Sequence, residues 1–132
     1  MAGSAYAGVV TLDWSCGPLA EGLACYRRAE FFEAHEHWES VWLQLAEPEK
    51  SFLQALIQVT AAFHHLQTGN LVGTVTLLQR ALQRLDLCPA CFGGIAVAPL
   101  RDELSEWLRS LESGTPSLDS ARPQILPMQP PD

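Results

Sequence analysis

The sequence has few basic residues, and this scarcity limits the partners that we expect for it. Its 132 residues include 8 Lys and Arg against 15 Asp and Glu, which gives a formal net charge of −7. Nucleic acids and anionic membrane surfaces are bound by clusters of Lys and Arg. We therefore expect neither a nucleic acid nor a membrane surface as a partner.

The sequence also lacks segments that direct a chain to or across a membrane. No Lys or Arg precedes Arg27, so the N-terminus has no charged region of the kind that opens a secretory signal peptide. No apolar run approaches the roughly 18 residues that a membrane-spanning helix needs. We expect a cytoplasmic protein, in which Cys16, Cys25, Cys88 and Cys91 are thiols.

Cys88 and Cys91 have the C-x-x-C spacing that redox centres and zinc sites use. No strand pattern precedes them, and the other two cysteines do not form a second close pair. The simpler interpretation is a helix end followed by the Pro/Gly-rich loop CPACFGG at residues 88–94. A labile metal site is the alternative.

Apolar residues recur at helical spacing along most of the chain, and no strand pattern of any length appears. The spacing and the capping residues predict about five helices. Their expected positions are after Pro18, over about 31–45, over about 48–68, after the N-cap Asn70, and from near Pro99 onward. The predicted fold is all-α: a compact bundle of two antiparallel helical hairpins plus a C-terminal helix, with hairpins similar in layout to tetratricopeptide repeats.

These helices predict a single domain over residues 18–113. Residues 1–17 are small and apolar without clear periodicity, so this N-terminal segment is poorly defined. Residues 114–132 hold five of the nine prolines and almost no core residues. We therefore expect a proline-rich tail that is disordered or loosely attached.

The stretch FFEAHEHWESVW at residues 31–42 places polar side chains on two sides of a helix. At about 100° per residue, His35 and Glu39 fall within the apolar arc that also holds the tryptophans, and Glu36 lies at its border. A buried imidazole or carboxylate needs a partner elsewhere in the fold. The next helix offers amides and an imidazole along one narrow stripe. The predicted buried cluster contains His35, Glu36, Glu39, Gln54, Gln58 and His65.

Two classes of function fit such a cluster. In the first, hydrogen bonds lock two helices in register and the chain is a small binding or assembly module, for instance a homodimer through exposed Leu53 and Ile57. In the second, His35, Glu39 and His65 hold a divalent metal (Zn, Fe or Mn) in a hydrolase-like enzyme, and Glu36 acts as the base. A small ligand is compatible with either class, and its identity is unknown.

Several patterns of catalytic chemistry are absent from the sequence. It contains no glycine-rich phosphate loop and no Ser/His/Asp set. No Glu lies three residues before a His, which excludes the paired Glu-x-x-His motif of di-iron helical bundles.

Three ordered motifs carry a resemblance to a known family. They are F-F-E-A-H-E-x-x-E-x-x-W (31–42), L-x-x-L-I-Q with A-A-x-x-H (53–58, 61–65), and G-N-x-x-G (69–73). The chain resembles, over roughly residues 18–87, the domain of unknown function family 309, a small all-helical family of bacteria and plastids without an assigned activity. The resemblance implies a helical bundle. The motif positions in this chain are Glu33, His35, Glu36, Glu39, Trp42, Gln58, His65, Asn70 and Gly73.

The turn before the first motif departs from the family pattern. This chain has Arg28-Ala29-Glu30 where the family often has Asn and Gly. The departure concerns the geometry of this turn and leaves the predicted helices unchanged.

Overall fold

The computed structural model describes residues 12–114 and 120–128 and consists of five helices and one short β-hairpin. The elements in chain order are α1 (Gly17–Arg27), α2 (Phe31–Trp42), α3 (Glu49–Gln67), α4 (Leu71–Leu85), β1 (Cys91–Phe92), β2 (Ile95–Ala96) and α5 (Val97–Glu112). The predicted all-α fold of about five helices is confirmed. The short antiparallel pair of β1 and β2 follows the predicted break after α4.

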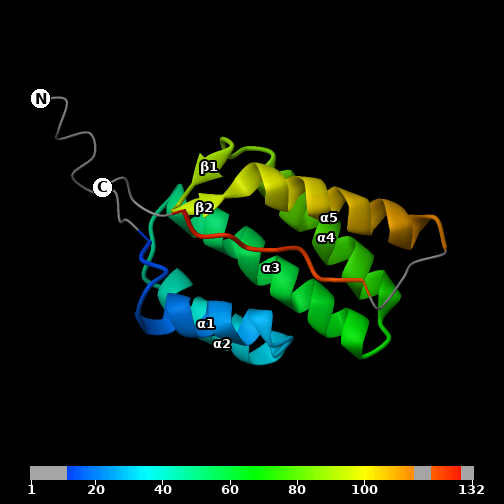
Figure 1. Ribbon diagram of the computed structural model, residues 1–132, viewed down its shortest axis with the longest axis horizontal. Helices are drawn as coiled ribbons and strands as arrows, with labels where there is room; N and C mark the ends of the chain where they lie inside the picture. The colour runs from blue at the N-terminus through cyan, green and yellow to red at the C-terminus, as the bar shows by residue number, and fades with distance from the viewer. Residues whose placement is uncertain (1–11, 115–119, 129–132) are drawn as a thin grey trace, which may run out of the picture.

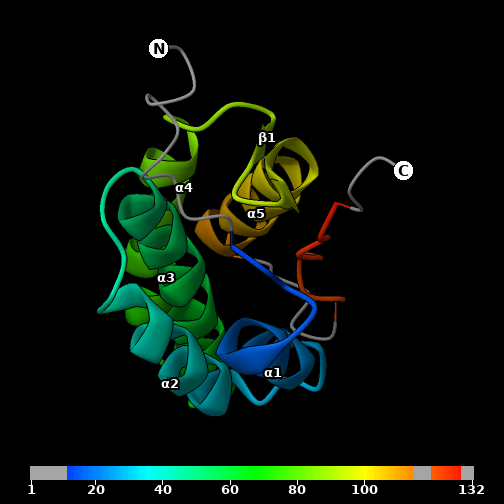
Figure 2. The ribbon, with the colours of Figure 1, turned by 90° about the vertical axis from the view of Figure 1, so that its left-hand side faces the viewer.

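The helices form two layers. Figures 1 and 2 show α2, α3 and α4 side by side in one layer, with α1 against α2 and α5 against α4 in the other. Short turns connect α1 to α2 and α3 to α4, so the two predicted helical hairpins are present and α5 follows them as the C-terminal helix. No helix within the described ranges is long and apolar enough to cross a membrane.

α3 is the central helix because it is apolar around most of its circumference. Phe52, Leu56 and Phe63 are fully buried on the side that faces the core. Leu53 and Ile57, which we expected to be exposed and available for a homodimer, are buried as well. α3 packs against both α2 and α4, and neither side chain is left exposed, so the prediction of an exposed apolar surface there was wrong.

The turn between α1 and α2 contains the one non-glycine residue with positive φ among the described residues. Ala29 has φ 61°, in the left-handed region that Asn and Gly tolerate better than Ala. Gln67 at the end of α3 donates its side-chain amide to the Ala29 carbonyl at 2.9 Å. The Ala-containing turn therefore keeps a left-handed conformation, and α3 helps to hold it.

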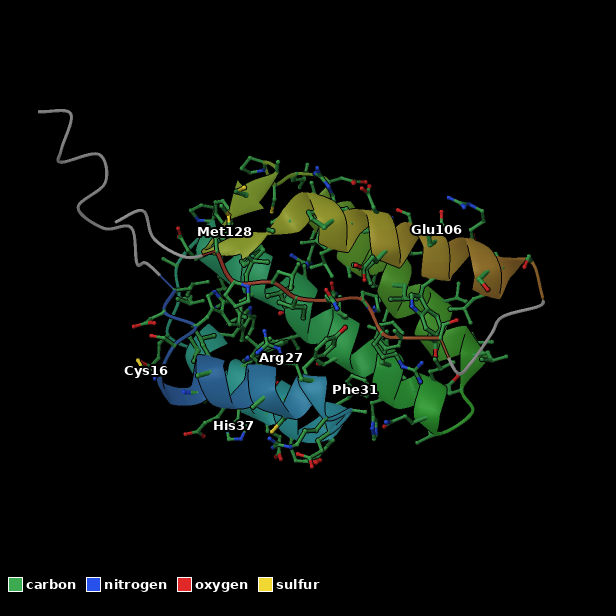
Figure 3. All side chains as sticks on the ribbon, viewed as in Figure 1. Cys16, Arg27, Phe31, His37, Glu106 and Met128 are labelled. Carbon is green, nitrogen blue, oxygen red and sulfur yellow. The ribbon has the colours of Figure 1, made fainter. Side chains whose placement is uncertain are left out.

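Residues 120–128, which we call the C-terminal strap, lie between α1 and α5 (Figure 1). Ile125 is only 2% exposed, and the hydroxyl of Tyr26 donates to the Pro123 carbonyl at 2.6 Å. The Ala96 amide donates to the Leu126 carbonyl at 3.0 Å, which ties the strap to β2. Figure 3 shows Met128 beside the hairpin.

This part of the tail therefore differs from the loosely attached segment that we predicted. Its prolines prevent a helix, but an extended segment can still pair its backbone and bury one apolar side chain. The end of the predicted N-terminal segment differs too: Leu12 and Trp14 belong to the core, and the Trp14 indole donates to the Gly93 carbonyl at 2.8 Å. The remainder of these two predicted segments (1–11, 115–119 and 129–132) lies outside the described residues.

The four cysteines are free thiols, as expected. Cys88 follows the end of α4 and Cys91 begins β1, so the C-x-x-C segment joins a helix end to the hairpin. Burial raises the pKa of the Cys88 thiol. Cys91 is exposed.

Candidate functional site

The polar residues of α2 lie closer to solvent than their spacing predicted. The exposed fraction of the side chain is 32% for His35 and 52% for Glu39, and Nε2 of His35 lies 3.6 Å from Oε2 of Glu39. Glu36 is exposed. The buried side of α2 is narrow, with only Phe31, Ala34 and Trp38 fully inside. The apolar arc predicted from the sequence was wider than the buried side of α2 that the structure shows. Glu39 lies outside that buried side, so the prediction that it turns inward was wrong.

Gln54, Gln58 and His65 lie along one line on α3, as their spacing in the sequence predicted. Gln58 is buried at 8% exposure, and Gln54 and His65 are half-buried. Residues of α2 and α4 line hollows together with the stripe, so the stripe opens to the outer face of the α2–α3–α4 layer. Amides and an imidazole therefore follow one line along α3, but the acids of α2 do not close over them.

The predicted metal site is not formed. Among residues 12–114 and 120–128, no group of three or more His, Cys, Asp or Glu side chains is placed so that it could hold a metal ion. His35 contacts Glu39 within its own helix, and His65 contacts Asn70. The proposed ligands therefore have other partners and do not converge.

His65 is positioned by the motif residues of the turn that follows it. The Asn70 side-chain oxygen accepts the Gly73 amide at 2.9 Å and caps α4, as predicted. The other end of the Asn70 amide lies 3.3 Å from Nδ1 of His65. A Cβ on Gly73 would lie 2.7 Å from Asn70 Nδ2 and 3.2 Å from His65 Cδ2, so glycine leaves room for this pair. G-N-x-x-G thus orients one imidazole.

Two adjoining hollows lie on the outer face of the α2–α3–α4 layer. The first, of about 290 Å³, is lined by Trp42, Glu47, Lys50, Ser51, Gln54 and Arg84. The second, of about 200 Å³, is lined by Gln58, Arg80, Gln83, Arg84 and Leu87. Both are open to solvent, and Arg84 lines both. We call these two hollows together, defined by the residues just given, the α3 groove.

Three cations line the α3 groove, and none of them was predicted from the sequence to be a site residue. Lys50 lies over the Trp42 ring, with its Nζ 4.3 Å from the ring centroid. Neither Lys50, Arg80 nor Arg84 forms an ion pair with any described residue. The signal in the sequence was the spacing of Arg80 and Arg84, which are four apart on one helix of a chain that is otherwise acidic.

Glu47 is the one carboxylate that lines the groove within the described chain, and it is already engaged. Its Oε1 accepts the Ser51 amide at 2.9 Å at the start of α3. Hydrogen bonding from Ser51 lowers the pKa of the Glu47 carboxyl, and the positive charges of Arg84 and Lys50 contribute less to the same shift. Glu47 therefore stays ionised and caps the helix, and it balances only one of the three cations.

The groove walls contain two buried polar atoms that have no hydrogen-bond partner among the described residues: Nε1 of Trp42 and Oε1 of Gln58. The chain has four tryptophans, and the other three behave differently. Their indoles donate to backbone carbonyls, Trp14 to Gly93, Trp38 to Leu19 and Trp107 to Ala121. Trp42 is thus the exception among the four.

Comparisons with known proteins identify a sequence family and one relative. The sequence profile of the domain of unknown function family DUF309 matches residues 19–77. A protein of Aquifex aeolicus (strain VF5), named "Uncharacterized protein", is 32% identical over 99 residues, which are 74% of this chain and 30% of that relative. This chain therefore spans less than a third of the relative's length.

The profile match includes Trp42, Lys50 and Gln58, whereas Arg80 and Arg84 lie beyond its end. The three motifs all fall within the matched residues. The family model matches residues 19–77, so the resemblance to the DUF309 family inferred from these motifs is confirmed over that part of the chain.

Proposed function

We propose that this chain is a small binding module that holds a segment of a partner protein in the α3 groove. The observation that carries the proposal is the pair of buried, unpartnered atoms, Trp42 Nε1 and Gln58 Oε1. Buried polar atoms in proteins are nearly always hydrogen-bonded, and leaving one unpaired costs about 1–3 kcal/mol. A bound partner would supply the missing hydrogen bonds.

The shape of the groove favours a segment of a protein over a small molecule. Sites for small molecules are usually concave enough to bury most of the ligand. Here the two hollows are open and follow one another along α3 and α4, joined at Arg84. A peptide main chain carries both N–H and C=O groups, so it can serve the Trp42 donor and the Gln58 amide together.

The other functions considered from the sequence have less support. The metal-dependent hydrolase lacks its ligand set, because His35, Glu39 and His65 do not converge. A homodimer through Leu53 and Ile57 lacks its surface, because both side chains are buried. A binding module needs neither feature.

Replacing Gln58 tests whether its amide serves the fold or a partner. In Gln58→Leu we expect the free energy of unfolding to stay within about 0.5 kcal/mol of the parent or to rise, because no intramolecular hydrogen bond is lost and a similar volume is kept. Chemical denaturation measures it. Thr60→Val is the matched control on the same helix: its buried hydroxyl donates to the Ile57 carbonyl at 2.7 Å, so about 1 kcal/mol should be lost.

Partner binding is tested with a photo-crosslinking amino acid placed at exposed Gln83 in the groove, in cells that make the full chain. The expected result is a defined cross-linked product that weakens in the Gln58→Leu background. The same crosslinker at Glu106, on the outer side of α5 (Figure 3), should not give that product. Marked destabilisation by Gln58→Leu, or a Gln83 product that is unchanged in it, would contradict the proposal.

A further inference from the structure

We infer that the segment held in the α3 groove is acidic; this inference rests on the proposed function. Three of the eight basic residues of the chain, Lys50, Arg80 and Arg84, line this one groove. A chain with a net charge of −7 thus gathers positive charge where its unpartnered polar atoms lie. Complementary charge is what brings such a surface and its partner together.

Three other basic residues of the described chain have acceptors, whereas the Arg27 side chain at the end of α1 has none within residues 12–114 and 120–128. Arg28 pairs with Glu30 at 2.9 Å and Arg109 with Glu106 at 2.7 Å. Arg101 donates to the carbonyls of Leu85 and Cys88. The side-chain nitrogens of Lys50, Arg80 and Arg84 make no hydrogen bond or ion pair with any residue in ranges 12–114 and 120–128. Their charges are therefore available to a ligand.

Nearby carboxylates do not neutralise the groove. Glu47 is held by the Ser51 amide, and its single charge faces three cations. Glu39 pairs with His35, and neither Glu36 nor Glu39 lines the two hollows. The side chains that line the groove thus carry a net positive charge, three cations against one carboxylate, although the chain as a whole is acidic.

The spacing of the cations sets the spacing of the acids that they would hold. Arg80 and Arg84 lie one turn apart on α4, with Cβ atoms about 5–6 Å apart. Acidic side chains two residues apart on an extended segment are separated by about 6.6 Å, close to this distance. Lys50 contributes a third charge from α3, beside Trp42. An acidic segment with carboxylates at alternate positions fits these three groups.

A segment of protein fits better than a free anion such as phosphate. Phosphate offers acceptors to Arg84 and Trp42 but is too small to occupy both hollows. An acidic peptide places carboxylates at the guanidinium groups while its main chain reaches the buried polar atoms. A peptide should therefore affect the Trp42 indole and the Gln58 amide together, whereas phosphate should not reach both.

Nuclear magnetic resonance of the full, ¹⁵N-labelled chain tests the inference, with the blocked peptides hexaglutamate and hexaglutamine and with inorganic phosphate as probes. The indole N–H signals report separately on the four tryptophans. With hexaglutamate we expect the Trp42 indole and the Gln58 side-chain amide signals to shift. The signals of Trp14, Trp38 and Trp107 should stay in place, because their donors are already paired. Binding should weaken as salt rises.

Charge-reversed variants identify the residues responsible. Arg80→Glu and Arg84→Glu should each lower the affinity for hexaglutamate at least about tenfold. Arg109→Glu makes the same change of charge on α5 at a residue that lines neither hollow, and it should leave the affinity unchanged. Circular dichroism of each variant verifies that the helices are intact.

The outcomes separate this inference from the proposed function. If hexaglutamine shifts the Trp42 signal as strongly as hexaglutamate, the groove binds peptides but the acidic preference is overturned. If phosphate reproduces the full response, the groove is a small-anion site and the peptide inference fails. If hexaglutamate shifts neither groove signal, or binds Arg84→Glu as well as the parent, the acidic inference is overturned while the crosslinking result still decides the proposed function.

Discussion

The two sides of α3 are completed in different ways. On one side the C-terminal strap lies between α1 and α5, and its backbone carbonyls accept the hydroxyl of Tyr26 and the indole of Trp107. On the other side no described segment covers the α3 groove, and Trp42 and Gln58 have no partner. The indole N–H of Trp107 is thus hydrogen-bonded under the strap, whereas that of Trp42 in the groove has no partner among the described residues.

This difference indicates where the chain depends on itself and where it depends on something else. The strap even places a cation among aromatic rings: the Arg122 guanidinium lies 5.0 Å from the Trp107 centroid and 5.4 Å from that of Phe63. The strap thus supplies backbone acceptors for two side chains of the helices, the Tyr26 hydroxyl and the Trp107 indole. Within the described residues no segment supplies acceptors in this way at the α3 groove, and this is the basis for proposing an external partner there.

The largest expected effect is at the strap. Ile125→Ala should lower the free energy of unfolding by about 3 kcal/mol, since deleting buried methyl groups in a packed core typically costs about 2–5 kcal/mol. Chemical denaturation of the full chain measures the loss. The matched control is its neighbour Leu126, which is 40% exposed, and Leu126→Ala should cost under about 1 kcal/mol. Equal losses would show that the strap is not anchored through Ile125.

A smaller effect is expected when a tryptophan on each side of α3 is replaced by phenylalanine, and the two variants compare the two sides directly. Trp107→Phe removes the donor to the Ala121 carbonyl and should cost about 2 kcal/mol, from the lost hydrogen bond and lost packing. Trp42→Phe loses no hydrogen bond, so its cost should be about 1 kcal/mol lower. Unfolding of both variants under identical conditions measures the difference. A Trp42→Phe variant as unstable as Trp107→Phe would break the comparison.

The smallest expected effect is the contribution of Tyr26 ionisation to the free energy of unfolding. It is negligible at neutral pH and grows as the pH rises above 10. Burial raises the pKa of its phenol above the usual value of 10.0, with Glu103 adding to the shift and Arg122 opposing it. The folded chain therefore keeps the proton while the unfolded chain releases it near pH 10. The stability due to this phenol is present below pH 10 and falls as pH rises above it, by up to about 1.4 kcal/mol per unit.

Denaturation at pH 9 and pH 11 measures this dependence, and Tyr26→Phe is the control that removes the titrating group. The variant should be less stable at pH 9 because it loses the bond to the Pro123 carbonyl, yet it should lose less stability between the two pH values. Parallel pH profiles for parent and variant would mean that the strap does not shield Tyr26 from ionisation.

Much of the fold could be predicted from the sequence because its signals are local. The N-cap Asn70 and the left-handed Gly69 mark a helix boundary through contacts within a few residues. The stripe of Gln54, Gln58 and His65 follows from helix geometry alone, and the structure retains it. The burial of Leu53 and the exposure of Glu39 could not be read in this way, because each depends on which helix packs alongside.

The sequence by itself determined the helices, their order and the line of polar residues along α3, since each of these arises from hydrogen bonds and side-chain spacing within one segment. Only the tertiary structure decided that Arg84 and Trp42 line the same hollow beside α3, and that Tyr26 and Trp107 find acceptors in the strap, 97 and 14 residues away along the chain. The physical reason is that burial and pairing are properties of assembled surfaces. A helix fixes the direction of its side chains, and the neighbours that pack against it decide which of them stay open to a partner.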